Sequence, residues 1–196
     1  MVMVNSTMKG LGTVAPDFKL VDVVSGKEMS LADFGGWQAL LVIFLCAHCP
    51  FVKHVAEALG KLTSEYSERG VGMVGIMSND VSEHPEDAPK PLAQFAAMNG
   101  WTFPVLYDES QAVAKAFGAA CTPDFFLFDA THKLIYRGQF DSSRPGNSEE
   151  ITGKDLRAAL NAVLSGEPES PDQRPSTGCN IKWKEGNEPE YFLKQS

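Results

Sequence analysis

Two cysteines stand three residues apart in the pentapeptide CAHCP, which begins at Cys46 and places the second thiol at Cys49. The thiolate form of cysteine attacks disulfides and peroxides, and its pKa falls when the residue opens a helix. A continuous apolar run over residues 39–45 precedes this motif, and Pro50 suits the first position of a helix. The spacing therefore predicts a nucleophile, Cys49, between a buried strand and a helix, with its pKa below the ordinary value of about 8.5.

Each of the two cysteines also has a purely structural interpretation, because free cysteine is among the most buried residue types in proteins. That interpretation weighs more for Cys46, which ends the apolar run, than for Cys49, which opens the helix. His48 and Lys53 are placed to add positive charge beside Cys49, which would favour its thiolate further.

A third cysteine precedes a threonine and a proline, in the order Cys121, Thr122 and Pro123, directly before a predicted strand. Proline lacks the N–H group that a sheet requires, so it is tolerated at the start of a strand, where its peptide bond can be cis. An ordinary trans proline at a sheet edge is the alternative. We include these three residues with Cys46 and Cys49 among the candidate catalytic residues.

A second thiol must resolve the mixed disulfide or sulfenic acid that forms when Cys49 attacks its substrate. Cys46 is nearest in sequence and ranks first, and Cys121 ranks second because it lies two residues before Pro123. Cys179 ranks third, since it lies in the C-terminal segment and would have to reach over within one chain or across a homodimer.

The hydrophobic pattern supplies the elements that position these motifs. Apolar residues recur with a helical period over 50–69, and a second buried strand follows, which makes a βαβ unit with parallel strands. Further along the chain, Thr152 and Asp155 predict a capping box for the last helix. The full prediction comprises strands at 18–21, 28–31, 39–45, 71–77, 103–106, 124–129 and 134–140, and helices at 50–69, 92–99, 108–118 and 152–164. This order predicts an α/β fold in which a central mixed sheet is flanked by helices.

Several of these motifs together resemble the thioredoxin-like superfamily. They are an APDF sequence at Ala15, an apolar strand that runs into a Cys-Pro helix, and a Thr-Pro pair before a strand. More narrowly, residues 11–166 resemble the peroxiredoxin-like branch, among relatives of alkyl hydroperoxide reductase and thiol-specific antioxidant proteins. The sequences PGN at Pro145 and GCNIKW at Gly178 are similar to features of that branch as well.

The resemblance implies a thioredoxin-like fold with an N-terminal β-hairpin and a C-terminal extension, and a cis-proline at Pro123 that flanks the reactive thiol. It implies a thiol-dependent oxidoreductase, either an antioxidant peroxidase or a thiol-disulfide oxidoreductase, with a role in cell redox homeostasis. The substrate would be a peroxide or a disulfide, and the reductant a thiol protein or a small thiol. No cofactor and no metal are implied.

The chain departs from both families at specific positions. Thioredoxins carry a second cysteine three residues after the one that opens the helix, and Val52 holds that place after Cys49. Peroxiredoxins carry a threonine three residues before their reactive cysteine and a proline seven before, where this chain has Cys46 and Val42. Their activating arginine would fall near Pro123. Disulfide exchange therefore stands beside peroxide reduction as the expected activity.

The organisation expected from these patterns is an arm over residues 1–12, a thioredoxin-like domain over 13–165, and a Pro-rich segment over 166–196 that packs on the domain or on a partner chain. The net charge of −8 argues against a nucleic-acid partner, because no basic stripe could neutralise phosphates. No stretch approaches the roughly 20 apolar residues that span a membrane, and the N-terminus lacks the basic start of a signal peptide. A cytoplasmic protein without membrane contact is therefore expected.

Two other functions remain open at this stage. Cys46, His48 and Cys49 offer soft ligands that could hold copper or zinc if their side chains converge. A thioredoxin-like domain in which Cys49 is inert could serve only as an interaction module.

Three polar residues outside these motifs each have two interpretations. Asn79 and Asp80 follow a strand at the end of the sheet where sites form in open α/β folds, but a solvated turn is the preferred interpretation. Arg144 could bind an anion, and a surface loop is again preferred.

Overall fold

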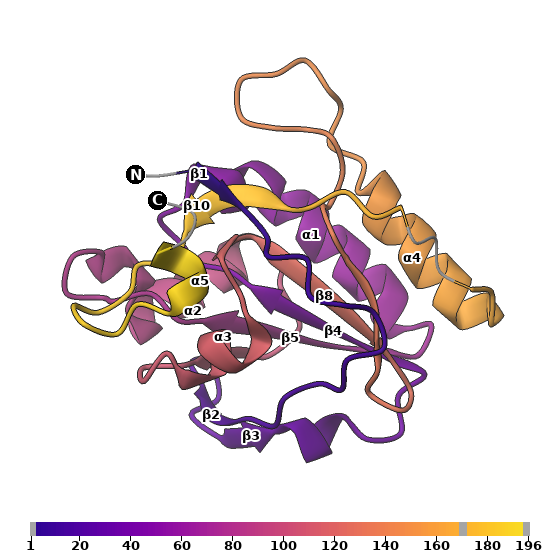
Figure 1. Cartoon of the computed structure of the whole chain (residues 1–196), viewed down its shortest axis with the longest axis horizontal. Coiled ribbons are helices and arrows are strands. Elements are labelled where there is room, and N and C mark those ends of the chain that lie inside the picture. The colour runs from indigo at the N-terminus through magenta and orange to yellow at the C-terminus, as the bar shows by residue number, and fades with distance from the viewer. Residues whose placement is uncertain (1–2, 169–171, 194–196) are drawn as a thin grey trace.

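Seven strands form one mixed sheet in a computed structural model that describes residues 3–168 and 172–193 (Figure 1). In spatial order they are β3 (Glu28–Ser30), β2 (Lys19–Asp22), β6 (Val105–Tyr107), β5 (Val71–Met77), β4 (Ala39–Phe44), β8 (Asp124–Asp129) and β9 (Leu134–Gly138). β5 runs parallel to β4 and to β6, and the other neighbours are antiparallel. The predicted central mixed sheet is confirmed, and so is the N-terminal hairpin, formed by β2 and β3.

The central strand β4 is covered on both faces. All six of its residues are buried, and successive side chains alternate between the two faces of the sheet. Leu41 and Ile43 belong to the apolar cluster on one face, whereas Leu40, Val42 and Phe44 belong to the cluster on the other. Burial on both faces explains the uninterrupted apolar run in the sequence.

Helices pack on both faces of the sheet (Figure 1). The cluster that contains Leu41 is completed by α1 (Pro50–Ser67), α2 (Pro89–Met98) and α4 (Lys154–Ser165). The opposite cluster contains α3 (Ala112–Phe117), whose Phe117 ring packs against Phe44 with centroids 5.5 Å apart. Shorter elements are the 3-10 turns Leu31–Phe34 and Pro85–Asp87 and the helix α5 (Glu190–Leu193).

A second, antiparallel sheet joins segments from both ends of the described chain to the loop before β8. It consists of β1 (Met3–Asn5), β10 (Thr177–Asn180) and β7 (Cys121–Thr122), with β10 in the middle. Gly178 permits this arrangement, because a Cβ atom at that position would clash with the carbonyl group of Thr122. β10 therefore lies directly beside the loop that contains the Thr-Pro motif.

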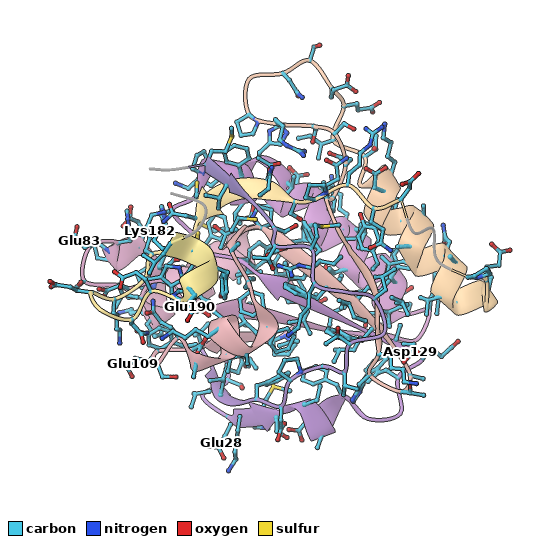
Figure 2. The ribbon with its side chains drawn as sticks, viewed as in Figure 1. Glu28, Glu83, Glu109, Asp129, Lys182 and Glu190 are labelled. Carbon is cyan, nitrogen blue, oxygen red and sulfur yellow. The ribbon has the colours of Figure 1, made fainter. Side chains whose placement is uncertain are left out.

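The segment after β10 packs on the domain. Ile181 is buried in the cluster around α3, and the backbone of Lys182 hydrogen-bonds to Asp80 and to Gln111. Exposed carboxylates such as Glu28, shown at the periphery in Figure 2, account for the negative net charge. Within the described residues, no helix is both long and apolar enough to cross a membrane.

One predicted helix cap is wrong. The capping box of Thr152 and Asp155 does not form, because α4 begins at Lys154 with Gly153 at its N-cap in the left-handed conformation. The Asp155 carboxylate accepts a hydrogen bond from Gln139 Nε2 at 2.6 Å instead. A tertiary contact has replaced the local cap.

An ion pair in the interior supports the Thr-Pro loop. Arg137 Nη2 lies 3.1 Å from Asp124 Oδ2, and both side chains are completely buried. The same guanidinium donates hydrogen bonds to Thr7 Oγ1 and to the Gly118 carbonyl oxygen. Asp124 directly follows Pro123, so this pair ties the loop to β9 and to the N-terminal segment.

Replacing Arg137 by methionine is expected to lower the free energy of unfolding by about 3–5 kcal/mol, because Asp124 then keeps a buried carboxyl group without its counter-charge. Urea unfolding followed by circular dichroism measures the change. Lys19→Met, which breaks the exposed pair with Glu28, is the matched control and should leave the unfolding curve nearly unchanged. Equal effects at both positions would contradict the structural role of the buried pair.

Candidate active site

Cys49 is the N-cap residue of α1, and Pro50 follows it at the start of the helix. The Cys49 side chain makes no capping hydrogen bond, but the nearby N–H of Val52, in the first turn, lowers the pKa of Cys49. The predicted order of buried strand, cysteine and helix is confirmed, and the thiol lies at the end of the helix where unpaired N–H groups favour a negative charge. The side chain of Cys49 is completely buried, which the sequence pattern does not reveal.

Cys179 lies directly against this thiol, with 2.7 Å between the two Sγ atoms. Both cysteines are free thiols, and Cys179 is also buried. β10, which carries Cys179, packs against α1, and the nearby N–H of Phe51 lowers the pKa of Cys179 slightly. The predicted order of partner thiols, with Cys46 first and Cys179 last, does not match this geometry, because β10 brings the cysteine most distant in sequence into contact with Cys49.

The other two cysteines differ in their relation to this pair. Cys46 is buried, has its Sγ 3.4 Å from Thr122 Oγ1, and lies close enough to Cys49 for each thiol to shift the pKa of the other. Cys121 Sγ contacts two backbone carbonyl oxygens, at 3.7 and 3.9 Å. Cys46, Cys49 and Cys179 thus form one group of thiols, which we call the thiol cluster.

Thr122 contacts every member of the thiol cluster. Its hydroxyl faces Cys46, its carbonyl oxygen lies 3.2 Å from Cys49 Sγ, and its backbone pairs with Cys179 between β7 and β10. When Cys49 is protonated, its S–H donates to that carbonyl oxygen. The Thr122–Pro123 peptide bond is cis, as the resemblance implies.

Hydrogen bonds within the thiol cluster decide which sulfur carries a charge. The contact with Cys179 lowers the pKa of Cys49 most, and the contact with Cys46 and the N–H of Val52 lower it further, against the opposing effect of burial. The same contact, together with burial, raises the pKa of Cys179. Burial, and then the hydrogen bond to Cys49, raises the pKa of Cys46. These directions favour the thiolate on Cys49, and the Cys179 thiol in contact with it can then donate its S–H.

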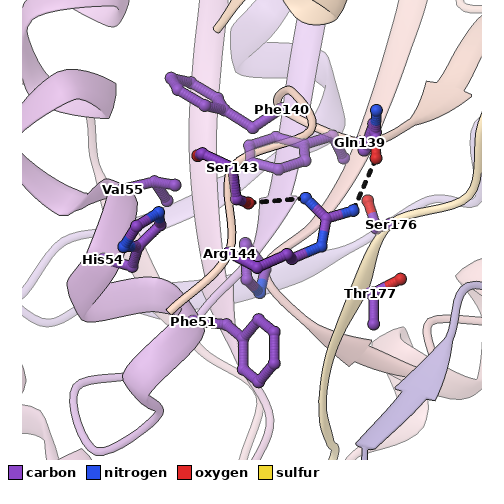
Figure 3. A pocket seen from close by; sticks show the side chains of 11 residues that line it. Phe51, His54, Val55, Gln139, Phe140, Ser143, Arg144, Ser176 and Thr177 are labelled. Atoms are coloured by element: carbon purple, nitrogen blue, oxygen red, sulfur yellow. Dashed lines mark hydrogen bonds between the residues drawn. The ribbon is translucent and has the colours of Figure 1, made fainter. Parts of the chain in front are cut away.

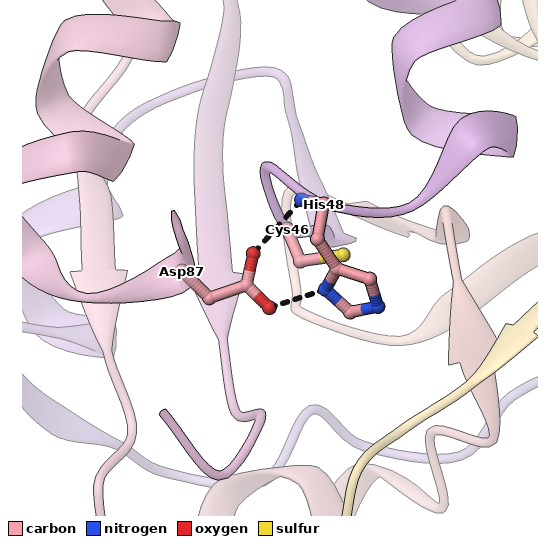
Figure 4. Close-up of side chains that lie close together, drawn as sticks. All are labelled: Cys46, His48 and Asp87. Carbon is pink, nitrogen blue, oxygen red and sulfur yellow. Dashed lines mark hydrogen bonds and ion pairs between the residues drawn. The ribbon is translucent and has the colours of Figure 1, made fainter. Parts of the chain in front are cut away.

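A buried carboxylate, Asp87, holds the loop between β4 and α1. Its Oδ1 accepts the backbone N–H groups of Ala47 and His48 at 2.8 and 3.0 Å. Its Oδ2 lies 2.6 Å from His48 Nδ1 (Figure 4). The same oxygen accepts a hydrogen bond from Asn79 Nδ2 at 2.8 Å. His84 stacks on the His48 ring with centroids 4.0 Å apart. Burial raises the pKa of Asp87, but the hydrogen bonds from His48 and Asn79 outweigh it and keep that pKa below its ordinary value.

These contacts revise two expectations and add one residue, Asp87, that the sequence did not single out. Asn79 is not part of a solvated turn, since it is buried and bonded to Asp87. His48 is paired with Asp87 and Lys53 is exposed, and neither is among the main interactions that lower the pKa of Cys49. Asp87 itself escaped notice, because the polar loop at 78–91 has no periodicity that would single out one carboxylate.

The expected metal ligands do not converge as a set. Among the described residues, Cys46, His48 and Asp87 each have one donor atom within 4.8 Å of the other two, and Cys49 is outside that group. Both Asp87 oxygens already accept hydrogen bonds, whereas His48 Nε2 is buried without a partner. A metal at this position would have to displace the bonds that hold the loop.

Most residues of this site lie within the part of the chain that matches a known protein family. A family model described as Redoxin matches residues 11–156, which contain Cys46, Cys49 and Pro123. The chain belongs to the Redoxin family. Cys179 lies beyond the matched residues, so the family pattern covers the nucleophile and not the thiol that contacts it.

A solved structure shares the thioredoxin-like fold of this redoxin, and two curated relatives share part of its sequence. The crystal structure of an uncharacterized conserved protein from Geobacillus kaustophilus is 49% identical, with a TM-score of 0.91 over 94% of this chain and 97% of that chain. Thiol-disulfide oxidoreductase ResA of Geobacillus thermodenitrificans is 29% identical over 65% of this chain and 68% of its own length. Peroxiredoxin Bcp of Escherichia coli is 28% identical over 64% of this chain and 76% of its own length.

The thiolate of Cys49 is expected to persist well below the ordinary cysteine pKa, so that its ultraviolet absorbance remains in mildly acidic solution and is lost only on stronger acidification. Cys179→Ala should raise the pKa of Cys49 more than Cys46→Ala does, because the contact with Cys179 is the larger stabilising interaction. Cys121→Ala is the matched control and should leave the titration unchanged. A wild-type pKa at or above the ordinary value would contradict the proposed charge distribution.

Proposed function

We propose that this redoxin is a dithiol oxidoreductase in which Cys49 attacks the substrate and Cys179 completes the reaction. The observation that carries the proposal is the 2.7 Å contact between their Sγ atoms at the N-terminus of α1. A thiolate at that position is an activated nucleophile, and a second thiol in contact with it is placed to resolve the intermediate once it has given its proton to the departing substrate thiolate.

The reaction with a disulfide proceeds in two exchanges. The Cys49 thiolate attacks one substrate sulfur, the substrate S–S bond breaks, and one substrate thiolate leaves. Cys179 then attacks Cys49 Sγ, which forms the Cys49–Cys179 disulfide and releases the second half of the substrate. The substrate gains two electrons, and the Cys179 proton leaves with the released thiols. A thiol protein or a small thiol returns the protein to its reduced form.

A hydroperoxide could be reduced by the same pair. Attack by Cys49 would give an alcohol and a sulfenic acid, and Cys179 would condense with that acid and release water. Disulfide exchange has the better support, because the interactions that lower the pKa of Cys49 come from thiols, the Val52 amide and Thr122 and include no arginine. In stopped-flow oxidation by hydrogen peroxide, a rate no faster than that of free cysteine would exclude a dedicated peroxidase.

A metal-binding module is the second candidate, supported by the proximity of Cys46, His48 and Asp87. Elemental analysis of the purified protein separates the two functions. We expect zinc and copper well below one ion per chain, because Asp87 is committed to the loop. A stoichiometric metal that is lost in Cys46→Ser and kept in Cys121→Ser would favour the metal site instead.

Mild oxidation of the reduced protein is expected to form a Cys49–Cys179 disulfide, since these sulfurs are already in contact. Peptide mass spectrometry without reduction identifies the bridge. Cys179→Ser should leave Cys49 as a sulfenic acid or mixed disulfide, whereas Cys121→Ser should form the same bridge as the wild type. A Cys46–Cys49 bridge as the main wild-type product would contradict the assignment.

Gly178→Ala is expected to slow formation of the Cys49–Cys179 disulfide by roughly tenfold or more, because the added Cβ meets the Thr122 carbonyl group and displaces β10. The rate of bridge formation under a fixed oxidant measures this effect. Gly10→Ala is the matched control, since a Cβ there meets no atom within 4 Å. Equal rates in the two variants would contradict the role of β10.

A further inference from the structure

One side chain, that of Asn79, joins the end of β10 to the loop that carries Cys49. Asn79 is buried and lies just after β5, at the edge of the sheet where the parallel strand β4 leads into α1. Its Nδ2 donates to Asp87 Oδ2 at 2.8 Å, and its Oδ1 accepts the backbone N–H of Lys182 at 2.9 Å. These partners fix the orientation of the amide, because a carboxylate can only accept and a backbone N–H can only donate.

The bond to Asp87 leads to the nucleophile. Asp87 Oδ1 accepts the backbone N–H groups of Ala47 and His48, and His48 directly precedes Cys49. Because Asp87 is completely buried, losing one of its hydrogen bonds would leave part of a charged group without a partner. Asn79 is therefore held at a fixed position relative to the loop that opens α1.

The bond to Lys182 leads to Cys179, which lies three residues earlier in the chain. The carbonyl oxygen of Lys182 also accepts the backbone N–H of Asp80, at 2.7 Å, so both of its backbone groups bond to the turn after β5. Between Cys179 and Lys182, Ile181 is buried and its N–H donates to the residue before β7, at 3.1 Å. Cys179 therefore has little freedom to move while Lys182 stays bound.

The start of β10 is anchored to a different part of the fold. Ser176 Oγ donates to the carbonyl oxygen of Gly138, at the end of β9, at 2.7 Å. Thr177 and Phe51 of α1 lie on opposite sides of a shallow recess (Figure 3). The start of the strand is thus tied to β9, whereas its end is tied through Asn79 to the loop of Cys49.

We infer that Asn79 is a positioning residue for the reaction of Cys49 with Cys179, and that its amide holds the two sulfurs in contact. The inference rests on the proposed function, because the contact matters only if these two thiols react with each other. Gln111 also bonds to the carbonyl oxygen of Lys182, but it lies at the start of α3 and holds the strand to a different element. Asn79 instead bonds to Asp87, which holds the loop of the nucleophile.

Replacing Asn79 by leucine removes both bonds with a neutral side chain of similar shape. We expect formation of the Cys49–Cys179 disulfide under a fixed oxidant to slow by roughly tenfold or more, because β10 is no longer tied to the loop of Cys49. Peptide mass spectrometry of samples quenched in acid at set times measures the rate. Ser78→Ala is the matched control and should leave the rate nearly unchanged, since Ser78 is also buried and its hydroxyl donates to Asp108, at 2.9 Å.

Titration of the thiolate absorbance separates positioning from a loss of stability. Asn79→Leu is expected to raise the pKa of Cys49, because the contact with Cys179 is the largest interaction that lowers it. In a Cys179→Ala background the same substitution should shift that pKa much less, because the contact that Asn79 maintains is already gone. Urea unfolding of each variant measures the structural contribution separately.

A second variant keeps the inference testable if Asn79→Leu folds poorly. Asn79→Ser retains a hydroxyl group, but a serine side chain is too short to bond to both Asp87 and Lys182. We expect it to slow disulfide formation and to raise the pKa of Cys49 in the same direction as leucine, by a smaller amount.

The outcomes separate this inference from the proposed function. Variants at Asn79 that lower the free energy of unfolding, but change neither the rate of disulfide formation nor the pKa of Cys49, overturn the inference and leave the proposed function standing. A pKa shift that is equally large in the Cys179→Ala background also overturns the inference, because the effect then does not act through β10. A wild-type protein that forms no Cys49–Cys179 disulfide overturns the proposed function, and the inference with it.

Discussion

The chemistry of this redoxin depends on the close approach of two backbones. β10 lies so near to Thr122 that only glycine fits at position 178, and this contact places Cys179 against Cys49. The N-terminus of α1 alone would offer Cys49 the N–H group of Val52. The largest single interaction that lowers the pKa of Cys49 is the contact with Cys179, a residue on a different element, β10.

Two buried carboxylates secure the loops on either side of the sulfur. Asp87 accepts backbone N–H groups from the loop that leads into α1, and Asp124 pairs with Arg137 directly after the cis-proline. A buried charge is tolerated only when it is paired or hydrogen-bonded, so each carboxylate requires its partners to stay in place. This requirement restricts the movement of both loops and keeps Cys46, Thr122 and Cys49 in contact.

Features that depend on neighbours in the sequence could be predicted. The apolar run of β4, the helix after Pro50 and the proline before β8 each follow from local composition and period. The partner of Cys49 could not be found in this way, because no local pattern in the C-terminal segment indicates that it forms a strand, β10, that pairs with β7. Asp87 was missed for the same reason, since its role arises only when a loop from another part of the chain folds over it.

The separation of Cys49 and Cys179 along the chain also determines when each cysteine becomes available during synthesis. The two residues are 130 positions apart, so the ribosome releases the nucleophile long before the strand that will sit beside it. Until β10 has emerged, Cys46 is the nearest thiol that Cys49 can meet. A bridge to Cys179 can therefore form only after β10 has been synthesised and has paired with β7, so its presence marks a molecule in which that strand has folded.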